Sequence, residues 1–148
     1  MVLGLSFSNK KIEVIGLGYV GLPLACIIAN QGFNVLGYDI NENLVKSIND
    51  HTFQSEEPGL KSLLNEVQCK QFFAFTEPQK ADIYIICVPT PLTECKKPDL
   101  SYVESAAKTI AKFIKPGDLI ILESTIPIGT TESIKNSIFS INKNITNH

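Results

Sequence analysis

Residues 12–39 read IEVIGLGYVGLPLACIIANQGFNVLGYD. The pattern predicts a β-strand, a glycine-rich turn, an apolar α-helix and a second β-strand that ends in an acid, Asp39. Three glycines meet three separate needs: Gly16 permits a tight turn out of the strand, Gly18 lets the backbone approach a ligand closely, and Gly21 lets the helix press against the sheet. Together these elements predict the first unit of a parallel α/β sheet.

Each part of this unit suits a bound dinucleotide. The diphosphate would lie at the helix N-terminus, where free backbone N–H groups and the helix dipole favour an anion. Asp39 stands 18 positions after Gly21, close to the roughly 20 expected of a carboxylate that binds the ribose 2′-hydroxyl. That carboxylate would repel a 2′-phosphate, and residues 40–45 contain no Arg or Lys to offset it. The sequence therefore favours NAD over NADP; a plain structural turn is the alternative.

Length and composition are those of one globular domain. The chain has 148 residues, of which 44% are hydrophobic and 19% charged, enough for a single well-formed core. The net charge is −2 and the 13 basic residues are scattered, unlike a nucleic-acid surface. The apolar run at residues 1–7 is too short for a signal peptide core, and no run approaches the roughly 20 apolar residues that span a bilayer. We therefore expect neither a nucleic-acid nor a membrane partner.

The four cysteines lack the paired spacing of a zinc site or a disulfide framework. Cys26 is expected in a helix and Cys87 in a buried strand. Reduced thiols in a cytoplasmic protein, with no metal site, are the expected state.

Apolar runs alternate with helical patterns, as in a parallel sheet covered on both faces. Strands are predicted at Lys11–Gly16, Asn34–Asp39, Phe72–Phe75, Asp82–Val88 and Leu119–Glu123. Helices are predicted at Tyr19–Gln31, Glu42–Asn49, Pro58–Glu66, Leu100–Phe113 and Thr130–Ser140. Because the fourth and fifth strands are apolar on both faces, we expect both in the middle of the sheet. The fold class is a doubly wound, mostly parallel Rossmann-type sheet of five or six strands. Residues 1–148 would form this one domain, with a core at 10–140 and a frayed tail at 141–148.

Ligands of such a sheet bind beyond the carboxyl ends of its strands. The glycine-rich turn, the loop 89–91 and the loop 124–129 should meet there. Thr90 offers a hydroxyl between two prolines, although those prolines could simply end the strand. Glu123, Ser124 and Thr125 set a carboxylate beside two hydroxyls; a helix cap with ordinary turn residues is the alternative.

Five motifs in this order resemble the UDP-glucose/GDP-mannose dehydrogenase family. They are GLGYVGLPLA at 16–25, EPGL at 57–60, VPTP at 88–91, PDLSYV at 98–103 and ESTIPIGTT at 123–131. Residues 90–92 and 98–103 look most like members that act on UDP-N-acetylhexosamines, such as UDP-N-acetylmannosamine and UDP-N-acetylglucosamine. The resemblance covers about residues 10–135.

The resemblance implies a reaction and a set of site residues. Members oxidise the C6 hydroxyl of a UDP-sugar to a carboxylate in two NAD-dependent steps, through a covalent adduct on a cysteine. They also have a helical dimerisation segment and a C-terminal domain, which imply a homodimer. By matching position, the cofactor site would comprise Gly16, Gly18, Tyr19, Val20 and Gly21 at the diphosphate, Asp39 at the adenosine ribose, Val88, Pro89 and Thr90 along the cofactor's side, and Ser124 and Thr125 after the fifth strand. Thr125 would also be catalytic, because it matches a threonine that orients a water beside the nicotinamide and the reacting carbon.

Departures from the family pattern bear on activity. Leu44 stands where many members carry a basic residue, which would weaken the hold on the cofactor. The family's later glutamate motif, its lysine and asparagine, and its nucleophilic cysteine match no position here; Cys87 and Cys95 are poor substitutes. We therefore expect the cofactor half of a longer enzyme, inactive alone. The alternatives are a non-catalytic dinucleotide-sensing module and a hydroxyacid or phosphogluconate-type dehydrogenase, which would lack the EPGL and ESTIPIGTT motifs.

Overall fold

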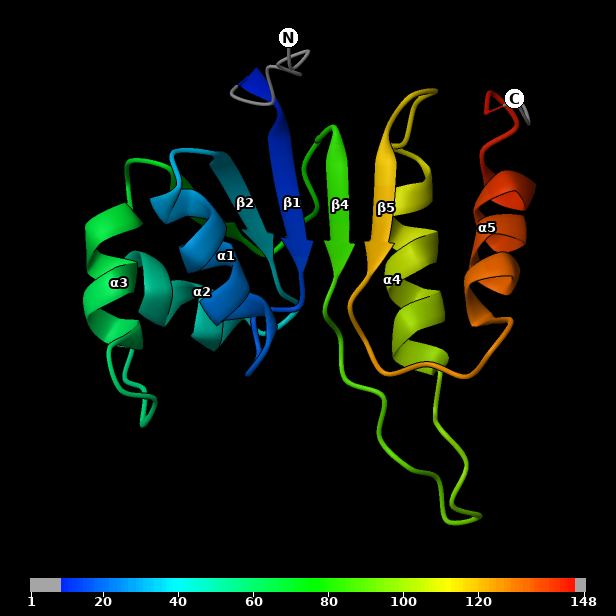
Figure 1. Ribbon diagram of the computed structural model, residues 1–148, viewed down its shortest axis with the longest axis horizontal. Helices are drawn as coiled ribbons and strands as arrows, with labels where there is room; N and C mark the ends of the chain where they lie inside the picture. The colour runs from blue at the N-terminus through cyan, green and yellow to red at the C-terminus, as the bar shows by residue number, and fades with distance from the viewer. Residues whose placement is uncertain (1–8, 146–148) are drawn as a thin grey trace, which may run out of the picture.

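The computed structural model describes residues 9–145, which form a five-stranded parallel sheet flanked by helices (Figure 1). The strands are β1 Lys11–Ile15, β2 Asn34–Tyr38, β3 Phe72–Phe75, β4 Ile83–Ile86 and β5 Leu119–Leu122. The helices are α1 Gly21–Asn30, α2 Glu42–Asn49, α3 Leu60–Val67, α4 Ser101–Ala111 and α5 Thr130–Ile141. The strand order β3-β2-β1-β4-β5, with every neighbouring pair parallel, confirms the doubly wound sheet.

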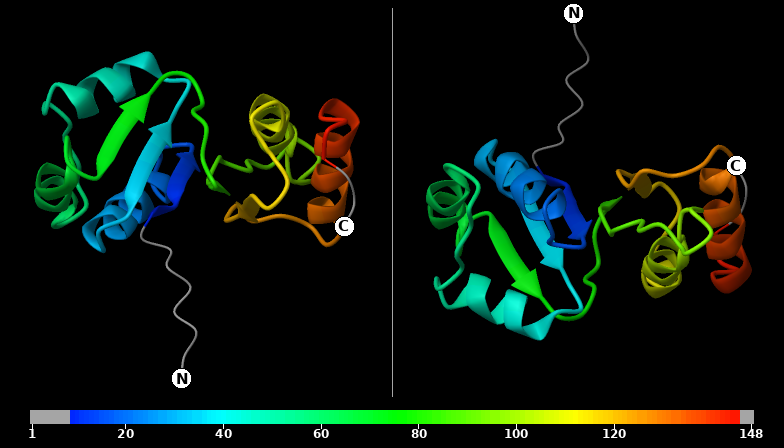
Figure 2. Two further views of the ribbon diagram at one scale, coloured as in Figure 1. Left: turned by 90° about the horizontal axis from the view of Figure 1, so that it is seen from above. Right: turned by 90° about the horizontal axis from the view of Figure 1, so that it is seen from below.

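Strand side chains alternate between two cores, one on each face of the sheet. On one face α1, α2 and α3 pack with Val14, Val35 and Phe72. On the other face α4 and α5 pack with Tyr84 and Ile86. Figure 2 shows α4 and α5 together, well apart from α1, α2 and α3. Because both faces exclude water, the strands read as continuous apolar runs rather than as alternating ones.

Every element lies within two residues of its predicted bounds. Local interactions explain where two of the helices begin. The helix α3 begins at Leu60 rather than at Pro58, because Gly59 adopts a left-handed φ of +84° that a helix cannot include. The helix α2 begins where predicted, since the Asn41 side chain accepts a hydrogen bond from the Leu44 N–H at 3.1 Å.

The expectation that β5 lies in the middle of the sheet is wrong. Within residues 9–145 it is an edge strand paired with β4 alone, and Leu119 is 52% exposed. Its apolar character has another cause: Ile120 and Leu122 pack on the core beneath α4, and Ile121 packs on the opposite core. An apolar run therefore reports cover on both faces, not the position of the strand among its neighbours.

The described residues contain no sixth strand. The predicted tail at 141–148 is described only as far as residue 145, so residues 146–148 lie outside the described part. The apolar N-terminal run at 1–7 lies outside it as well. The domain bounds remain a prediction.

The connection from β3 to β4, residues 76–82, crosses the sheet without a helix. It places the Gln79 N–H 2.6 Å from Oε1 of Glu13 on β1. Glu13 is fully buried, and its Oε2 has no hydrogen-bond partner among the described residues. Burial raises the pKa of Glu13 to about 7, although the Gln79 hydrogen bond acts in the opposite direction. A carboxyl group is thus buried between the sheet and the crossing connection.

All four cysteines are free thiols, with Cys26 and Cys87 buried and Cys69 and Cys95 exposed. Burial raises the pKa of Cys26 to about 12 and that of Cys87 to about 11, which makes both poor nucleophiles. Between residues 9 and 145, no cluster of His, Cys, Asp and Glu could hold a metal ion. No helix in that part has both the length and the apolar character needed to cross a membrane.

Candidate functional site

The glycine-rich turn brings β1 and α1 into unusually close contact. Gly16 leaves β1 with a φ of +90°, and its N–H donates to the Tyr38 carbonyl at 2.8 Å. A Cβ on Gly21 would lie 1.7 Å from the Gly16 carbonyl oxygen, so the helix fits only because this residue has no side chain. A Cβ on Gly18 would meet nothing within 4 Å. The turn is therefore tightly packed behind and open in front, which fits a bound diphosphate.

The N-terminus of α1 borders this opening without a side-chain cap. Its N-cap residue, Val20, makes no side-chain hydrogen bond, and the first turn contains no acidic residue. The first backbone bonds run from the N–H groups of Leu22 and Leu24 to the carbonyls of Gly18 and Val20. The uncapped N–H groups and the helix dipole favour an anion at this point.

Asp39 joins the end of β2 to the glycine-rich turn. Its Oδ2 accepts a hydrogen bond from the Leu17 N–H at 2.7 Å, and its Oδ1 accepts one from the Asn41 N–H at 2.8 Å. Both bonds fix the carboxylate, and each oxygen keeps a further lone pair for an incoming hydroxyl. Sequence reasoning predicted a ribose contact here and missed that the same side chain holds the turn.

The ends of β4 and β5 are tied together at the same edge of the sheet. The Ser124 hydroxyl donates to the Val88 carbonyl at 2.6 Å, and the Cys87 N–H donates to the Ile15 carbonyl at 2.8 Å. The first of these bonds fixes the backbone immediately before Thr125, whose side chain is exposed. The segments that follow β1, β4 and β5 therefore form one continuous edge.

A cavity of about 590 Å³ opens along this edge, within the size range of small-molecule sites. The predicted site residues that line it are Gly16, Gly18, Tyr19, Val20, Asp39, Val88, Pro89, Thr90, Ser124 and Thr125. Of the predicted set, Gly21 alone lies outside the lining, behind the turn. The structure thus brings together three segments that lie far apart in the sequence.

One side of the cavity was missed by sequence reasoning. It is formed by α4, through Tyr102, Ser105, Ala106 and Thr109. Steps of three and four residues place these side chains on one face of the helix, so the spacing was visible in the sequence. Nothing in the sequence, however, says that this face turns toward the end of β2. Leu44 also lines the cavity, so the departure from the family pattern falls within the site.

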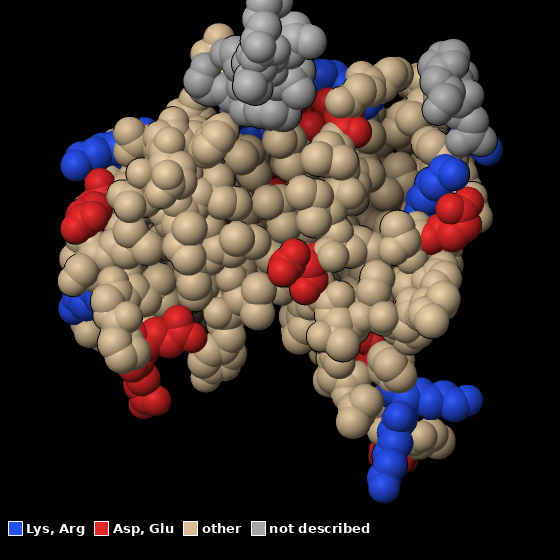
Figure 3. Space-filling view, in the orientation of Figure 1, with Lys and Arg blue, Asp and Glu red and all other residues tan. Residues whose placement is uncertain are grey.

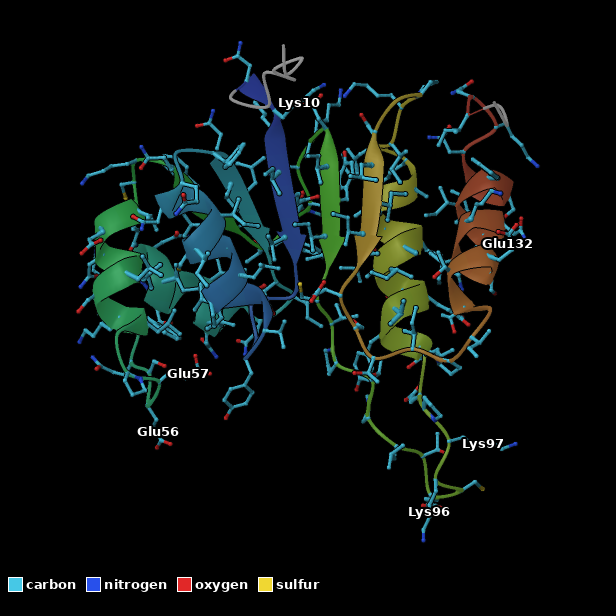
Figure 4. The ribbon with its side chains drawn as sticks, viewed as in Figure 1. Lys10, Glu56, Glu57, Lys96, Lys97 and Glu132 are labelled. Atoms are coloured by element: carbon cyan, nitrogen blue, oxygen red, sulfur yellow. The ribbon has the colours of Figure 1, made fainter. Side chains whose placement is uncertain are left out.

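In the part of the chain that the structure describes, the charged residues of the lining are Asp39 and Glu123, with no Lys. Figure 3 shows Lys side chains around the periphery of the face that it presents; the sequence contains no Arg. Lys96 and Lys97 lie at the far end of the β4–α4 connection, well beyond the sheet (Figure 4). An anion in the cavity would therefore be held by backbone N–H groups and the α1 dipole rather than by a cationic side chain.

Comparisons with known proteins converge on one family. The sequence profile described as the UDP-glucose/GDP-mannose dehydrogenase family, NAD binding domain, matches residues 10–147. The UDP-N-acetyl-D-mannosamine dehydrogenase of Methanocaldococcus jannaschii is 48% identical over 130 residues, covering 85% of this chain and 30% of that protein. The NDP-N-acetyl-D-galactosaminuronic acid dehydrogenase of Ralstonia nicotianae is 45% identical over 126 residues, covering 84% and 30%.

A solved structure agrees with these sequence matches. The UDP-D-ManNAc dehydrogenase of Pyrococcus horikoshii has a TM-score of 0.84 and 39% identity, over 90% of this chain and 32% of that chain. The chain spans about 30% of the length of the curated relatives it matches.

Proposed function

Because the chain belongs to the UDP-glucose/GDP-mannose dehydrogenase family and forms its NAD-binding domain, we propose that it holds NAD for a nucleotide-sugar 6-dehydrogenase. The whole protein would oxidise the C6 hydroxyl of a UDP-sugar to a carboxylate in two steps, with NAD as the hydride acceptor in each. The substrate class that we propose is a UDP-N-acetylhexosamine, because relatives at 48% and 39% identity are named for UDP-N-acetylmannosamine.

The observation that carries this proposal is the cavity in which the three predicted segments meet. Open space at Gly18 and the uncapped N-terminus of α1 suit the diphosphate. Asp39, already fixed by two backbone N–H groups, would accept hydrogen bonds from the adenosine ribose. The side of α4 that carries Ser105 and Ala106 lies nearby and would border the adenosine.

The Thr125 side chain would act at the opposite end of the cavity. The residue before it is anchored by the bond from the Ser124 hydroxyl to the Val88 carbonyl, which places Thr125 just beyond the end of β5. A hydroxyl held there can orient a water molecule for proton transfer beside the reacting carbon. We assign this positioning of water to Thr125.

We expect the chain to bind NAD but to produce no NADH from UDP-sugars on its own. Neither buried thiol suits a nucleophile, and the sequence holds no match to the family's nucleophilic cysteine. Absorbance at the NADH band during incubation with NAD and a panel of UDP-sugars measures this directly. Steady NADH formation would show that this chain carries the whole catalytic apparatus. It would contradict our proposal that the chain binds NAD without supplying the nucleophile.

Replacing Asp39 with alanine should raise the dissociation constant for NAD roughly tenfold to a hundredfold, because hydrogen bonds to a charged group are lost. The same change should reduce the difference between the affinities for NAD and NADP, because the carboxylate that repels a 2′-phosphate is gone. Isothermal titration calorimetry with both dinucleotides measures the two effects.

The matched control is Asp50→Ala. Asp50 follows α2, forms an ion pair with Lys46 and lies outside the cavity lining. Its loss should leave NAD affinity unchanged. No NAD binding by the wild-type chain, or equal affinities for Asp39→Ala and the wild type, would contradict the proposed function.

We further propose that the whole protein is a cytoplasmic homodimer with no nucleic-acid partner. The buried free thiols Cys26 and Cys87 support a reducing compartment, and the family resemblance supports the dimer. The net charge of −2 supports the absence of a nucleic-acid partner.

A further inference from the structure

Glu123 carries a carboxylate that has no protein partner among residues 9–145. It follows β5, where its N–H donates to the Ile86 carbonyl at 2.9 Å. Glu123 is one of the residues that line the cavity, and it is exposed. Within residues 9–145 its carboxylate has neither a hydrogen bond nor an ion pair, whereas six other ion pairs occur there. A structural role in holding the loop therefore has no contact to support it.

The position of Glu123 follows from strand register. Ile86 and Leu122 are partners in β4 and β5, so the next residues, Cys87 and Glu123, lie side by side at the strand ends. The charge of Glu123 adds to the burial that raises the pKa of the Cys87 thiol. Asp39 follows β2 and Glu123 follows β5, so two strands, β1 and β4, lie between them. The usual strand spacing puts the ends of β2 and β5 about 14 Å apart.

The two carboxylates therefore occupy opposite halves of a doubly wound sheet. In such sheets each half of the fold receives one half of the dinucleotide, across the switch point between β1 and β4. Asp39 marks the adenosine half, which leaves the ends of β4 and β5 for the nicotinamide half. The ring on that side is a cation in the oxidised cofactor and neutral in the reduced one.

We propose that Glu123 makes the site discriminate between the two redox states, binding NAD⁺ more tightly than NADH by attraction to the cationic ring. This inference rests on the proposed function and extends it. Among the described residues, no Lys lines the cavity to neutralise the carboxylate. A preference for the oxidised form would help a dehydrogenase release NADH after each hydride transfer.

The test is the ratio of the NAD⁺ and NADH dissociation constants, measured by calorimetry on the chain. For Glu123→Gln we expect NAD⁺ binding to weaken about three- to tenfold, the size expected for unit charges several ångströms apart near solvent. NADH affinity should change by less than about twofold, because the neutral ring gains nothing from the charge. Glu123→Asp keeps the charge and should keep most of the preference.

Two further measurements separate electrostatics from structure. Raising the salt concentration should reduce the preference of the wild type, because salt screens exposed charges, and should leave Glu123→Gln unaffected. Glu132→Gln is the control: Glu132 lies on α5, 3.4 Å from the Lys135 ammonium and outside the lining (Figure 4). It should bind both forms like the wild type.

The outcomes distinguish this inference from the proposed function. Equal weakening of both redox forms in Glu123→Gln, or an unchanged ratio, would overturn the role of Glu123 while leaving cofactor binding intact. Failure of the wild type to bind either form would overturn the proposed function and the inference with it.

Discussion

Replacing Gly21 with alanine is expected to destabilise the domain by roughly 3 kcal/mol or more, as for severe overpacking. The added Cβ would lie 1.7 Å from the Gly16 carbonyl oxygen and 3.2 Å from the Cys87 Cβ. Because the first of these atoms belongs to the backbone, no side-chain rotation relieves the overlap. Moving α1 away would open the core formed with Leu22 and Ala25. Urea denaturation of the two chains measures the difference in the free energy of unfolding.

Gly18→Ala is the matched variant in the same turn. Its Cβ would meet nothing within 4 Å, so the free energy of unfolding should change by no more than about 1 kcal/mol, the usual size of a glycine-to-alanine effect. NAD affinity should nevertheless fall by about tenfold or more, because the methyl group would occupy the space through which the diphosphate approaches the backbone. If Gly21→Ala were as stable as the wild type, or Gly18→Ala as destabilised as Gly21→Ala, the packing described for this turn would be wrong.

The first unit of the fold was predictable because its requirements are local. The roles of Gly16, Gly18 and Gly21 follow from steric limits within one turn, which depend little on the rest of the chain. The meeting of the three loops followed from the rule that parallel strands end at a common edge.

Features that depend on tertiary arrangement were not predictable. The edge position of β5 depends on which strands pair, and its apolar residues report only what covers each face. The contribution of α4 to the cavity depends on how that helix is rotated over the sheet. The bond from Asp39 to the Leu17 N–H required the distance between β2 and the turn, which sequence spacing does not give.

Glu13 shows most clearly how tertiary structure can bury a residue that the local sequence does not mark as buried. Charged residues rarely occupy a strand buried on both faces, and nothing in the run KIEVI marks the glutamate as buried. It is covered because the β3–β4 connection passes over it and supplies the Gln79 N–H. Its charge also contributes to the raised pKa values of Tyr38 and Tyr84, after the larger effect of their own burial.

This burial predicts an unusual dependence of stability on pH. In the folded state the pKa of Glu13 is about 7, whereas its ordinary value is 4.5. Below pH 4.5 Glu13 is protonated in both the folded and the unfolded state, so its burial carries no cost from a buried charge. Between pH 4.5 and 7 folding must take up a proton, so the contribution of Glu13 to stability falls as pH rises. Above pH 7 a charge is buried, at a cost of about 3 kcal/mol.

Glu13→Gln should remove this dependence. The tyrosines whose pKa values respond to Glu13, Tyr38 and Tyr84, titrate above this pH range, so the difference in the free energy of unfolding between the two proteins reports the ionisation of Glu13. We expect that difference to move in favour of the variant by about 3 kcal/mol between pH 4.5 and pH 8. Urea titrations across this range measure it, with Glu77→Gln as the control, since Glu77 lies exposed on the same connection. A constant difference between Glu13→Gln and the wild type would mean that the carboxyl group titrates as it does in water. In that case the crossing connection would not exclude solvent from Glu13, and the core beneath α4 and α5 would be more hydrated than the structure describes.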